Sequence, residues 1–291
     1  MDARARAASL AIWRRPVAPE PVGGGITNAN FVVDDGARRC FVRVGDDIPV
    51  HHIVRWHELA ASRAAHAAGI SPAVLHAEPG VLVLDLIEGR TLGPADVRDR
   101  RQLERIMPLL RRVHRELPRF LRGPTLTFWV FHVLRDYAAG LVEAGHRLAR
   151  DAPHLLHRAE ILERAVGPID LVFGHNDLLA ANLIDDGRRL WLVDWDYGGW
   201  NSPLFDLGGL ASNSELPPTE RDWLLEAYFE RPLDDDLRCR AHAMLTASLL
   251  REAMWSMVSE IHSHLEFNFV AYTAENLARF ERAWSAFEPM R

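Results

Sequence analysis

The chain contains no lysine, so all 34 of its basic residues are arginine. It has only two cysteines, Cys40 and Cys239, in no metal-binding spacing. So few cysteines are typical of a protein of the reducing cytoplasm, where we expect both thiols to be free. The lack of lysine has a firm consequence, because any role that lysine commonly takes in a functional site must fall to arginine here.

Long apolar runs and an excess of positive charge are also missing. No apolar run approaches the roughly 18 residues that a membrane helix needs, so we expect no membrane insertion. Arg4 and Arg6 are not followed by a continuous apolar segment, which argues against a signal peptide. The net charge of -6 and the pI near 6.2 give no reason to expect nucleic-acid binding. The oligomeric state is left open.

The N-terminal residues 1–85 are expected to form a small α+β lobe. Asp34-Asp35-Gly36 is a turn signal between two strand-like runs, and Gly69 is a plausible end for an alanine-rich helix. The expected elements are a hairpin of residues 31–33 and 40–44, a helix over residues 53–68 and a strand over residues 81–84.

Residues 86–291 are predicted to be mainly helical. A second hairpin signal, Asp186-Gly187, lies between residues 182–184 and 189–193. Pro108 lies inside the first helical window and could kink or split that helix. Apolar residues recur with helical period over residues 100–116, 128–150, 153–166, 218–230, 234–262 and 268–286.

The segment from His175 to Asp194 carries the clearest chemical signal. It reads H-x-D-x-x-x-x-N from His175 to Asn182, and Asp194 follows a predicted strand. This spacing is typical of a kinase catalytic loop, with Asp177 as the base that accepts the acceptor's hydroxyl proton. The hairpin would bring Asn182 and Asp194 together as oxygen ligands for one Mg²⁺ ion. The alternative interpretation is an ordinary polar turn.

Residues of the N-terminal lobe could complete a phosphate site. Arg43 lies on the second hairpin strand, where a kinase places its phosphate-binding lysine, and Glu58 could hold it by an ion pair. Gly24 and Gly25 would let backbone N–H groups approach phosphates. Each residue also has an ordinary interpretation, as a solvated strand arginine, a surface glutamate or a simple turn.

Taken together, these residues resemble the choline/ethanolamine kinase family, within the aminoglycoside phosphotransferase-like and protein-kinase-like superfamily. The resemblance covers nearly the whole chain and rests on residues 24–28, 41–44, 86–90, 173–179, 193–197 and 201–207. It implies a two-lobed, protein-kinase-like α+β fold with a small β-rich N-terminal lobe and a mainly helical C-terminal lobe. Arg43 matches a strand that carries arginine in choline kinases. Asn176 matches their catalytic loop, where the wider superfamily more often has glycine.

The same resemblance implies ATP and Mg²⁺ as cofactors. It assigns nucleotide binding to Gly24, Gly25, Asn28, Arg43, Glu58, Leu86 and Ile87, the last two in an interlobe hinge whose backbone binds adenine. Asp177 is then the catalytic residue, and Asn182 and Asp194 are the metal ligands. His175 braces the catalytic loop, and Asp206 buttresses it.

Residues 251–255 and 267–272 resemble the family's choline-binding helices. The resemblance implies that aromatic residues cage a quaternary ammonium by cation–π attraction. The matching residues are Tyr197, Trp255, Phe269 and Tyr272, with Asp196 as the nearby anion. The alternative is an ordinary helix-packing core. The chain departs from the family at Glu252, where a second tryptophan is frequent, and at Asn213, where an acidic residue is usual. Glu252 could accept a hydrogen bond from a primary or secondary amine.

The expected activity is ATP-dependent phosphorylation of a small cationic amino-alcohol, above all choline or ethanolamine. Alternatives are a related kinase for thiamine or an aminoglycoside, a ligand-binding pseudokinase and a metal hydrolase. The acidic run of residues 234–236 could suggest an aminoglycoside groove, but a helix N-cap is the simpler interpretation. Asp177, Asn182 and Asp194 argue against a pseudokinase. The absence of an HxH or HExxH motif argues against a hydrolase.

Overall fold

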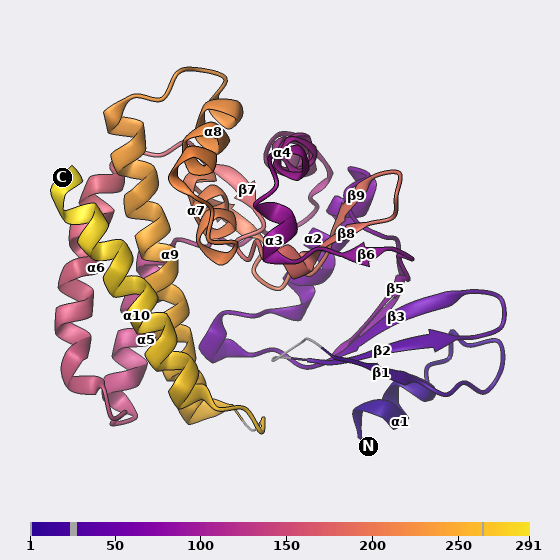
Figure 1. Ribbon diagram of the computed structural model, residues 1–291. Coiled ribbons are helices and arrows are strands. Elements are labelled where there is room, and N and C mark those ends of the chain that lie inside the picture. Colours follow the sequence, from indigo (N-terminus) through magenta and orange to yellow (C-terminus); the bar gives the residue numbers. More distant parts are fainter. Residues whose placement is uncertain (1, 24–27, 264) are drawn as a thin grey trace.

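The computed structural model describes residues 2–23, 28–263 and 265–291. Its N-terminal part holds a five-stranded antiparallel sheet in the order β1-β2-β3-β5-β4, and the rest is mostly helical (Figure 1). The strands are β1 (Glu20–Val22), β2 (Ala29–Asp34), β3 (Arg39–Val44), β4 (Val74–Glu78) and β5 (Val81–Asp85). The predicted α+β class is therefore confirmed.

Strands β2 and β3 form the predicted N-terminal hairpin. Their register pairs Ala29 with Val44 at the open end and Asp34 with Arg39 at the loop. The carboxylate of Asp35 closes the loop, since it accepts hydrogen bonds from the backbone N–H groups of residues 37 and 38. This local capping is why an Asp-Asp-Gly sequence is a reliable turn signal.

One face of this sheet packs into an apolar core, and the other lines a cavity. Cys40 and Val42 of β3 belong to a small apolar core that is shared with α1 (Ala3–Ala8). Phe41 and Arg43 alternate with them and line a cavity on the opposite face. Because side chains alternate along a strand, this register places Arg43 on the cavity face of the sheet, opposite the small apolar core.

The predicted helix over residues 53–68 is α2 (Arg55–Ala67). It ends before Gly69, whose φ of +68° lies in the left-handed region that glycine adopts readily. Ala61 and Ala64 of α2 pack into the large core of the helical part and not into the small core of the sheet. Helix α2 thus joins the two parts, and the lobe boundary near residue 85 stays a prediction.

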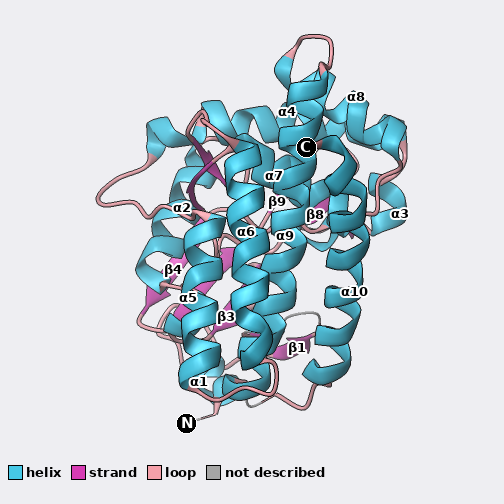
Figure 2. Ribbon diagram, turned by 90° about the vertical axis from the view of Figure 1, so that its left-hand side faces the viewer, coloured by secondary structure: helices cyan, strands magenta, loops and turns pink. Residues whose placement is uncertain are grey.

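Each of the six predicted helical windows contains a helix, and α4 continues unsplit through Pro108. The helices of this part are α3 (Pro94–Val97), α4 (Arg100–Arg115), α5 (Val130–Glu143), α6 (Ala152–Val166), α7 (Pro203–Asn213), α8 (Pro218–Phe229), α9 (Asp235–His262) and α10 (Phe269–Phe287). Helix α9 packs against α5, α6, α7 and α10 (Figure 2). Asp234 caps α9 by accepting a hydrogen bond from the Leu237 N–H at 2.8 Å, so the N-cap interpretation of the acidic run is confirmed.

Helix α7 was not predicted, because residues 203–212 are buried all round and show no amphipathic stripe. Its close packing against α9 favours a glycine. A Cβ atom at Gly208 would lie 3.0 Å from the backbone of Leu245, which is too close for an ordinary contact. Gly208 therefore lets α7 approach α9 at the point where α7 carries Asp206 toward the catalytic loop.

Short strands frame that loop. The predicted second hairpin is β8 (Leu183–Asp185) with β9 (Leu190–Leu192), and β6 (Arg90–Thr91) extends it. A separate pair joins β7 (Val172–Gly174) to β10 (Gly199–Asn201). The catalytic-loop sequence therefore leaves β7 and enters β8. Among the described residues, none of the helices combines the length and apolar character needed to cross a bilayer.

His51 ties the N-terminal part to the helical part. Its Nδ1 lies 3.4 Å from the Tyr137 hydroxyl on α5, and its Nε2 lies 3.1 Å from the Ser259 hydroxyl on α9. Burial, followed by the positive charge of Arg251, lowers the pKa of His51 to about 3. The ring is therefore neutral in the folded chain at neutral pH.

We predict that His51 makes the folded chain less stable as the pH falls below its ordinary pKa of 6.5. The unfolded chain then binds a proton that the folded chain refuses until about pH 3. In this window the free energy of unfolding loses up to about 1.4 kcal/mol per pH unit, and the contribution is fully present above the window. Denaturant unfolding at several pH values measures the free energy of unfolding. Below pH 6.5 this free energy should fall less steeply with decreasing pH in His51→Gln than in the unchanged chain. His154→Gln, at an exposed position, is the control, and parallel curves for all three proteins would contradict the prediction.

Candidate active site

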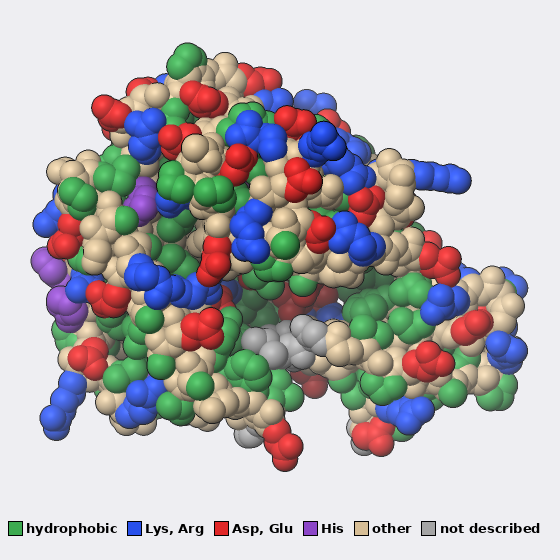
Figure 3. Space-filling model, in the orientation of Figure 1, with side chains coloured by type: hydrophobic (Ala, Val, Ile, Leu, Met, Phe, Trp, Pro, Cys, Tyr) green, Lys and Arg blue, Asp and Glu red, His purple; other side chains and the backbone are tan. Residues whose placement is uncertain are grey.

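A cavity of about 430 Å³ lies between the inner face of the sheet and the segments around β8 and β9. It is lined by five of the residues predicted to bind nucleotide: Asn28, Arg43, Glu58, Leu86 and Ile87. Gly24 and Gly25 lie outside the described residues. The predicted metal ligands Asn182 and Asp194 line the same cavity. Figure 3 shows that the surface is hollowed between the strand-rich part and the helical part, with acidic side chains visible inside.

Arg43 and Glu58 form the ion pair that the sequence predicts. Nη2 of Arg43 lies 2.5 Å from Oε2 of Glu58, and both side chains are buried. Arg55, one turn earlier on α2, places its Nη1 2.9 Å from the same oxygen. Sequence reasoning missed Arg55, although its i, i+3 spacing from Glu58 puts the two on one helix face. Arg43, Glu58 and Arg55 thus form a network of two arginines around one carboxylate.

Arg55 extends this network to Asp196 and Asn28. Its Nη1 lies 2.6 Å from Oδ1 of Asp196, and its Nη2 donates to Oδ1 of Asn28 at 2.6 Å. Nδ2 of Asn28 donates to Oδ2 of Asp196 at 3.1 Å. Both oxygens of Asp196 are therefore engaged, one by Arg55 and the other by Asn28. Its predicted role as an anion for the acceptor's ammonium stays a prediction.

Asp206, on α7, anchors the catalytic loop through hydrogen bonds to the loop backbone. Its Oδ2 accepts hydrogen bonds from the backbone N–H of His175 at 2.8 Å and from Nε2 of His114 at 2.9 Å. Its Oδ1 accepts from the backbone N–H of Asn176 at 2.7 Å. Although burial raises the pKa of Asp206, these donors lower it below its usual range. Asp206 is therefore a buried carboxylate whose donors come mainly from one short loop.

His175 braces the loop with its ring. Nε2 donates to the carbonyl of Val193 at 2.9 Å, and Nδ1 accepts from the backbone N–H of Asp177 at 3.3 Å. These bonds require a neutral ring, and burial lowers the pKa of His175 accordingly. The ring thus links the residue that precedes Asp194 to the candidate catalytic residue.

Asn176 has a φ of +63°, in the left-handed region that favours glycine and tolerates asparagine. Its Nδ2 donates to the carbonyls of Tyr197 at 2.9 Å and Gly199 at 3.1 Å. Its Oδ1 accepts from Nδ2 of Asn201 at 3.1 Å. A glycine could adopt this backbone but not these bonds, so asparagine fastens the loop to the segment that carries Tyr197.

Asp177 stands at the end of this braced loop. Nδ2 of Asn182 donates to its carbonyl at 2.9 Å, and Nη1 of Arg251 lies 3.9 Å from its Oδ1. Enclosure by the protein raises the pKa of Asp177 to about 7, although Arg251 acts in the opposite direction. Such a carboxylate is balanced between its two protonation states near neutral pH, which suits a group that accepts a proton.

Asn182 and Asp194 meet at the open end of the second hairpin, where the Val193 N–H donates to the Asn182 carbonyl at 3.0 Å. Enclosure, followed by the charges of Asp196, Asp177 and Glu58, raises the pKa of Asp194 well above its ordinary value. Converging negative charge and an amide oxygen fit a hard divalent cation.

Among the described residues, no group of three or more His, Cys, Asp or Glu side chains could hold a metal ion. Mg²⁺ usually takes only one or two carboxylates and completes its shell with water and phosphate oxygens. Asn182 and Asp194 fit that pattern, with phosphate as the missing partner.

The four aromatic residues predicted for the acceptor come together beside α9. Nε1 of Trp255 donates to the Tyr197 hydroxyl at 2.9 Å, and the rings of Trp255 and Phe269 lie 6.1 Å apart. The Tyr272 hydroxyl donates to Oε1 of Glu252 at 2.7 Å. The departure at Glu252 is therefore part of the same cluster. Sequence reasoning assigned no role to Arg251, which lies within it.

Asn213, the other departure, closes the far end of α7. Its Nδ2 donates to the carbonyl of Leu178 at 3.4 Å, immediately after Asp177. An acidic side chain could not donate this bond. The substitution therefore has a local role in holding the catalytic loop.

The model of the phosphotransferase enzyme family matches residues 19–242, which is most of the chain. The chain belongs to this family. The solved structure of a choline/ethanolamine kinase family protein from Mesorhizobium loti is similar to this chain, with a TM-score of 0.80 and 28% identity, covering 99% of this chain and 96% of that chain. The predicted kinase-like fold and the resemblance to choline/ethanolamine kinases are therefore confirmed.

Two relatives are similar in sequence. The probable ethanolamine kinase of Arabidopsis thaliana is 27% identical over 291 residues, which cover 87% of this chain and 76% of that protein. Protein LicA of Haemophilus influenzae is 26% identical over 216 residues, which cover 70% of this chain and 61% of LicA. The match thus spans less than two thirds of that relative.

We predict that Asp206→Asn destabilises the chain by about 3 kcal/mol, because it removes a buried charge whose three donors then lose an acceptor. An amide can accept on one side only, so at least one N–H of the loop or of His114 is left unpaired. Denaturant unfolding at neutral pH measures the loss. Asp170→Asn, at an exposed position, is the matched control. Equal stability of the two variants would show that Asp206 does not anchor the loop.

Proposed function

We propose that this chain is an ATP-dependent kinase that transfers the γ-phosphoryl group to the hydroxyl of a small cationic amino-alcohol, choline or ethanolamine. One observation carries the proposal. The Arg43–Glu58 pair, Asn182 and Asp194 border one cavity, and Asn182 is hydrogen-bonded to Asp177. Phosphoryl transfer requires little more than phosphate-binding cations, metal ligands and a group that orients the acceptor.

The N-terminal residues 1–85 would bind the nucleotide, and residues 86–291 would supply the catalytic loop and the acceptor site. Apolar side chains of β2, β3 and β5 would enclose the adenine, next to the backbone of Leu86 and Ile87. Arg43 would contact the phosphates, held in place by Glu58. A guanidinium is suited to this role because its planar donors match phosphate oxygens.

Asp177 would accept the proton of the acceptor hydroxyl and direct its oxygen toward the γ-phosphorus. The new O–P bond then forms as the bond to the β,γ-bridging oxygen breaks, and ADP leaves. Asn182 and Asp194 would hold Mg²⁺, which when bound offsets the charge of the phosphates. The backbone anchors from Asp206 and His175 would keep Asp177 in position during this step.

The acceptor would lie among Tyr197, Trp255, Phe269 and Tyr272, beside Asp177. The names of the ethanolamine kinase and choline/ethanolamine kinase relatives support this acceptor class. Thiamine, an aminoglycoside and ligand binding without transfer are the competing possibilities. Free Cys40 and Cys239 are consistent with our expectation that the chain acts in the cytoplasm.

An ADP-release assay with ATP and Mg²⁺ tests the proposal. The acceptors should be choline, ethanolamine, its methylated forms, thiamine and an aminoglycoside. We expect release that depends on a small amino-alcohol and exceeds the hydrolysis seen without acceptor. Release that responds only to thiamine or the aminoglycoside would replace the acceptor class, and none with any acceptor would contradict the kinase assignment.

We predict that Asp177→Asn lowers kcat by about 10²- to 10⁴-fold, the range typical of losing a general base. Binding of ATP should be nearly unchanged, because Asp177 does not line the nucleotide cavity. Steady-state kinetics and calorimetric titration with ATP separate the two effects, and Asp151→Asn, at an exposed position, is the control. Near-normal turnover of Asp177→Asn would remove Asp177 from the mechanism.

A further inference from the structure

Arg251 lies in the centre of the aromatic set that the proposed function assigns to the acceptor. It lies on α9, and only 4% of it is exposed. Its guanidinium carbon lies 4.4 Å from the centre of the Tyr197 ring and 5.7 Å from that of Phe128. Its Nη1 lies 3.1 Å from Oε2 of Glu252 and 3.9 Å from Oδ1 of Asp177. The chain therefore places a cation of its own on the face of Tyr197.

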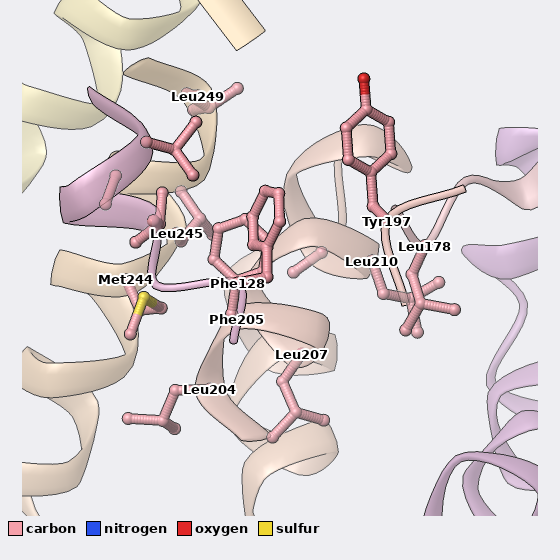
Figure 4. Packing of buried hydrophobic residues seen from close by; sticks show 14 of the residues in the cluster. Phe128, Leu178, Tyr197, Leu204, Phe205, Leu207, Leu210, Met244, Leu245 and Leu249 are labelled. Atoms are coloured by element: carbon pink, nitrogen blue, oxygen red, sulfur yellow. The ribbon is translucent and has the colours of Figure 1, made fainter. Parts of the chain in front are cut away.

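The contact between Arg251 and Tyr197 affects acceptor binding because of where the Tyr197 ring lies. In Figure 4 its ring lies to one side of the packed cluster around Phe205 and Leu245, with its hydroxyl directed away from that cluster. A ring in this position could offer its face to a substrate cation. With Arg251 already over the ring, a second cation would meet like-charge repulsion in a largely enclosed site.

Trp255 also has neighbours over its ring. The His51 ring stacks against it with centroids 4.8 Å apart and an interplanar angle of 27°. Phe269 packs at 6.1 Å with an angle of 58°, and the indole N–H is bound to the Tyr197 hydroxyl. A cage for a quaternary ammonium requires open aromatic faces, and in this arrangement Arg251 already occupies a face of Tyr197 and His51 a face of Trp255.

Glu252 offers a different means of binding an ammonium group. Its Oε1 accepts from the Tyr272 hydroxyl and its Oε2 from Arg251, and 22% of its side chain is exposed. An ionised carboxylate has about four lone-pair sites, so it can accept further N–H donors. A primary ammonium carries three such donors, whereas a quaternary ammonium has none.

We propose that Arg251 and Glu252 are specificity-determining residues that favour a primary ammonium over a quaternary one, so that the acceptor belongs to the ethanolamine class. The inference rests on the proposed function, because it places the acceptor beside Asp177. Arg251 occupies the cation position over one face of Tyr197, so a methylated ammonium on that face would have to displace it. Glu252 accepts the N–H groups of the acceptor at the exposed edge of the cluster.

The first experiment compares ethanolamine, its mono- and dimethyl derivatives and choline as acceptors of the full chain in the ADP-release assay. We expect kcat/KM to fall with each added methyl group and to be about 10-fold or more lower for choline than for ethanolamine. Equal or higher kcat/KM for choline would overturn the inference and leave the proposed kinase function intact.

Two variants separate the roles of the residues. Glu252→Gln should raise KM for ethanolamine by about 10-fold or more, and KM for choline by a smaller factor, with KM for ATP nearly unchanged. Arg251→Met, which removes the cation but keeps an unbranched side chain, should shift the ratio of the two kcat/KM values toward choline. Glu275→Gln, at an exposed position on α10, is the control. Unchanged ratios in both variants would overturn the inference, and thermal unfolding checks that each variant is folded.

Binding distinguishes this inference from the proposed function. Calorimetric titration with ethanolamine and with choline, in the presence of Mg²⁺ and a non-hydrolysable ATP analogue, requires no transfer. Tighter binding of ethanolamine that is lost in Glu252→Gln supports the inference even if no acceptor is phosphorylated. Binding of neither amine, or equal binding of both, would overturn it.

Discussion

The site depends on one electrostatic constraint: carboxylates that converge beside the cavity have only arginine to balance them. Arg55 contacts Glu58 and Asp196 through the same Nη1 atom, while Arg43 binds Glu58 from β3. A planar guanidinium with five donors can bridge two carboxylates and an amide at once, which a lysine ammonium does less rigidly. The absence of lysine is therefore compatible with a phosphate site of this type. The same network joins the sheet to the helical part, since Asp196 lies beyond β9.

Around the catalytic loop the nearest arginine lies farther from its carboxylate than in this network. Asp177 lies 3.9 Å from Arg251, a longer separation than the 2.5 Å between Glu58 and Arg43, and burial raises the pKa of both Asp177 and Glu58 to about 7. Enclosed carboxylates without close partners destabilise a fold. Asp206, by contrast, has close partners, because it accepts from two successive backbone N–H groups of the loop and so holds the loop against α7. Gly208, two residues after Asp206 on α7, lets the helix approach α9 closely enough to hold it there.

Much of this arrangement could be predicted from the sequence where the signal is local. The hairpins, the long amphipathic helices and the H-x-D-x-x-x-x-N spacing are set by turn residues and periodicity over short ranges. Helix α7 was missed because full burial removes its amphipathic pattern. The i, i+3 contact of Arg55 with Glu58 is local, but the contacts of Arg55 with Asp196 and of Arg251 with Tyr197 join residues that are distant in sequence. An arginine on a helix has no local feature that shows which buried carboxylate or ring it will meet.

Arg251 shows why an aromatic set read from a sequence does not define its ligand. Tyr197, Trp255, Phe269 and Tyr272 do cluster, yet a cluster becomes a cation cage only if its ring faces stay open. His51 covers Trp255 from the N-terminal part, and Arg251 covers Tyr197 from α9. Both covering groups come from outside the aromatic pattern itself. What remains accessible at the edge is a carboxylate, and a carboxylate distinguishes ammonium groups by their N–H donors, whereas an aromatic face responds mainly to charge. The acceptor's degree of methylation is therefore the property to which this site is most sensitive.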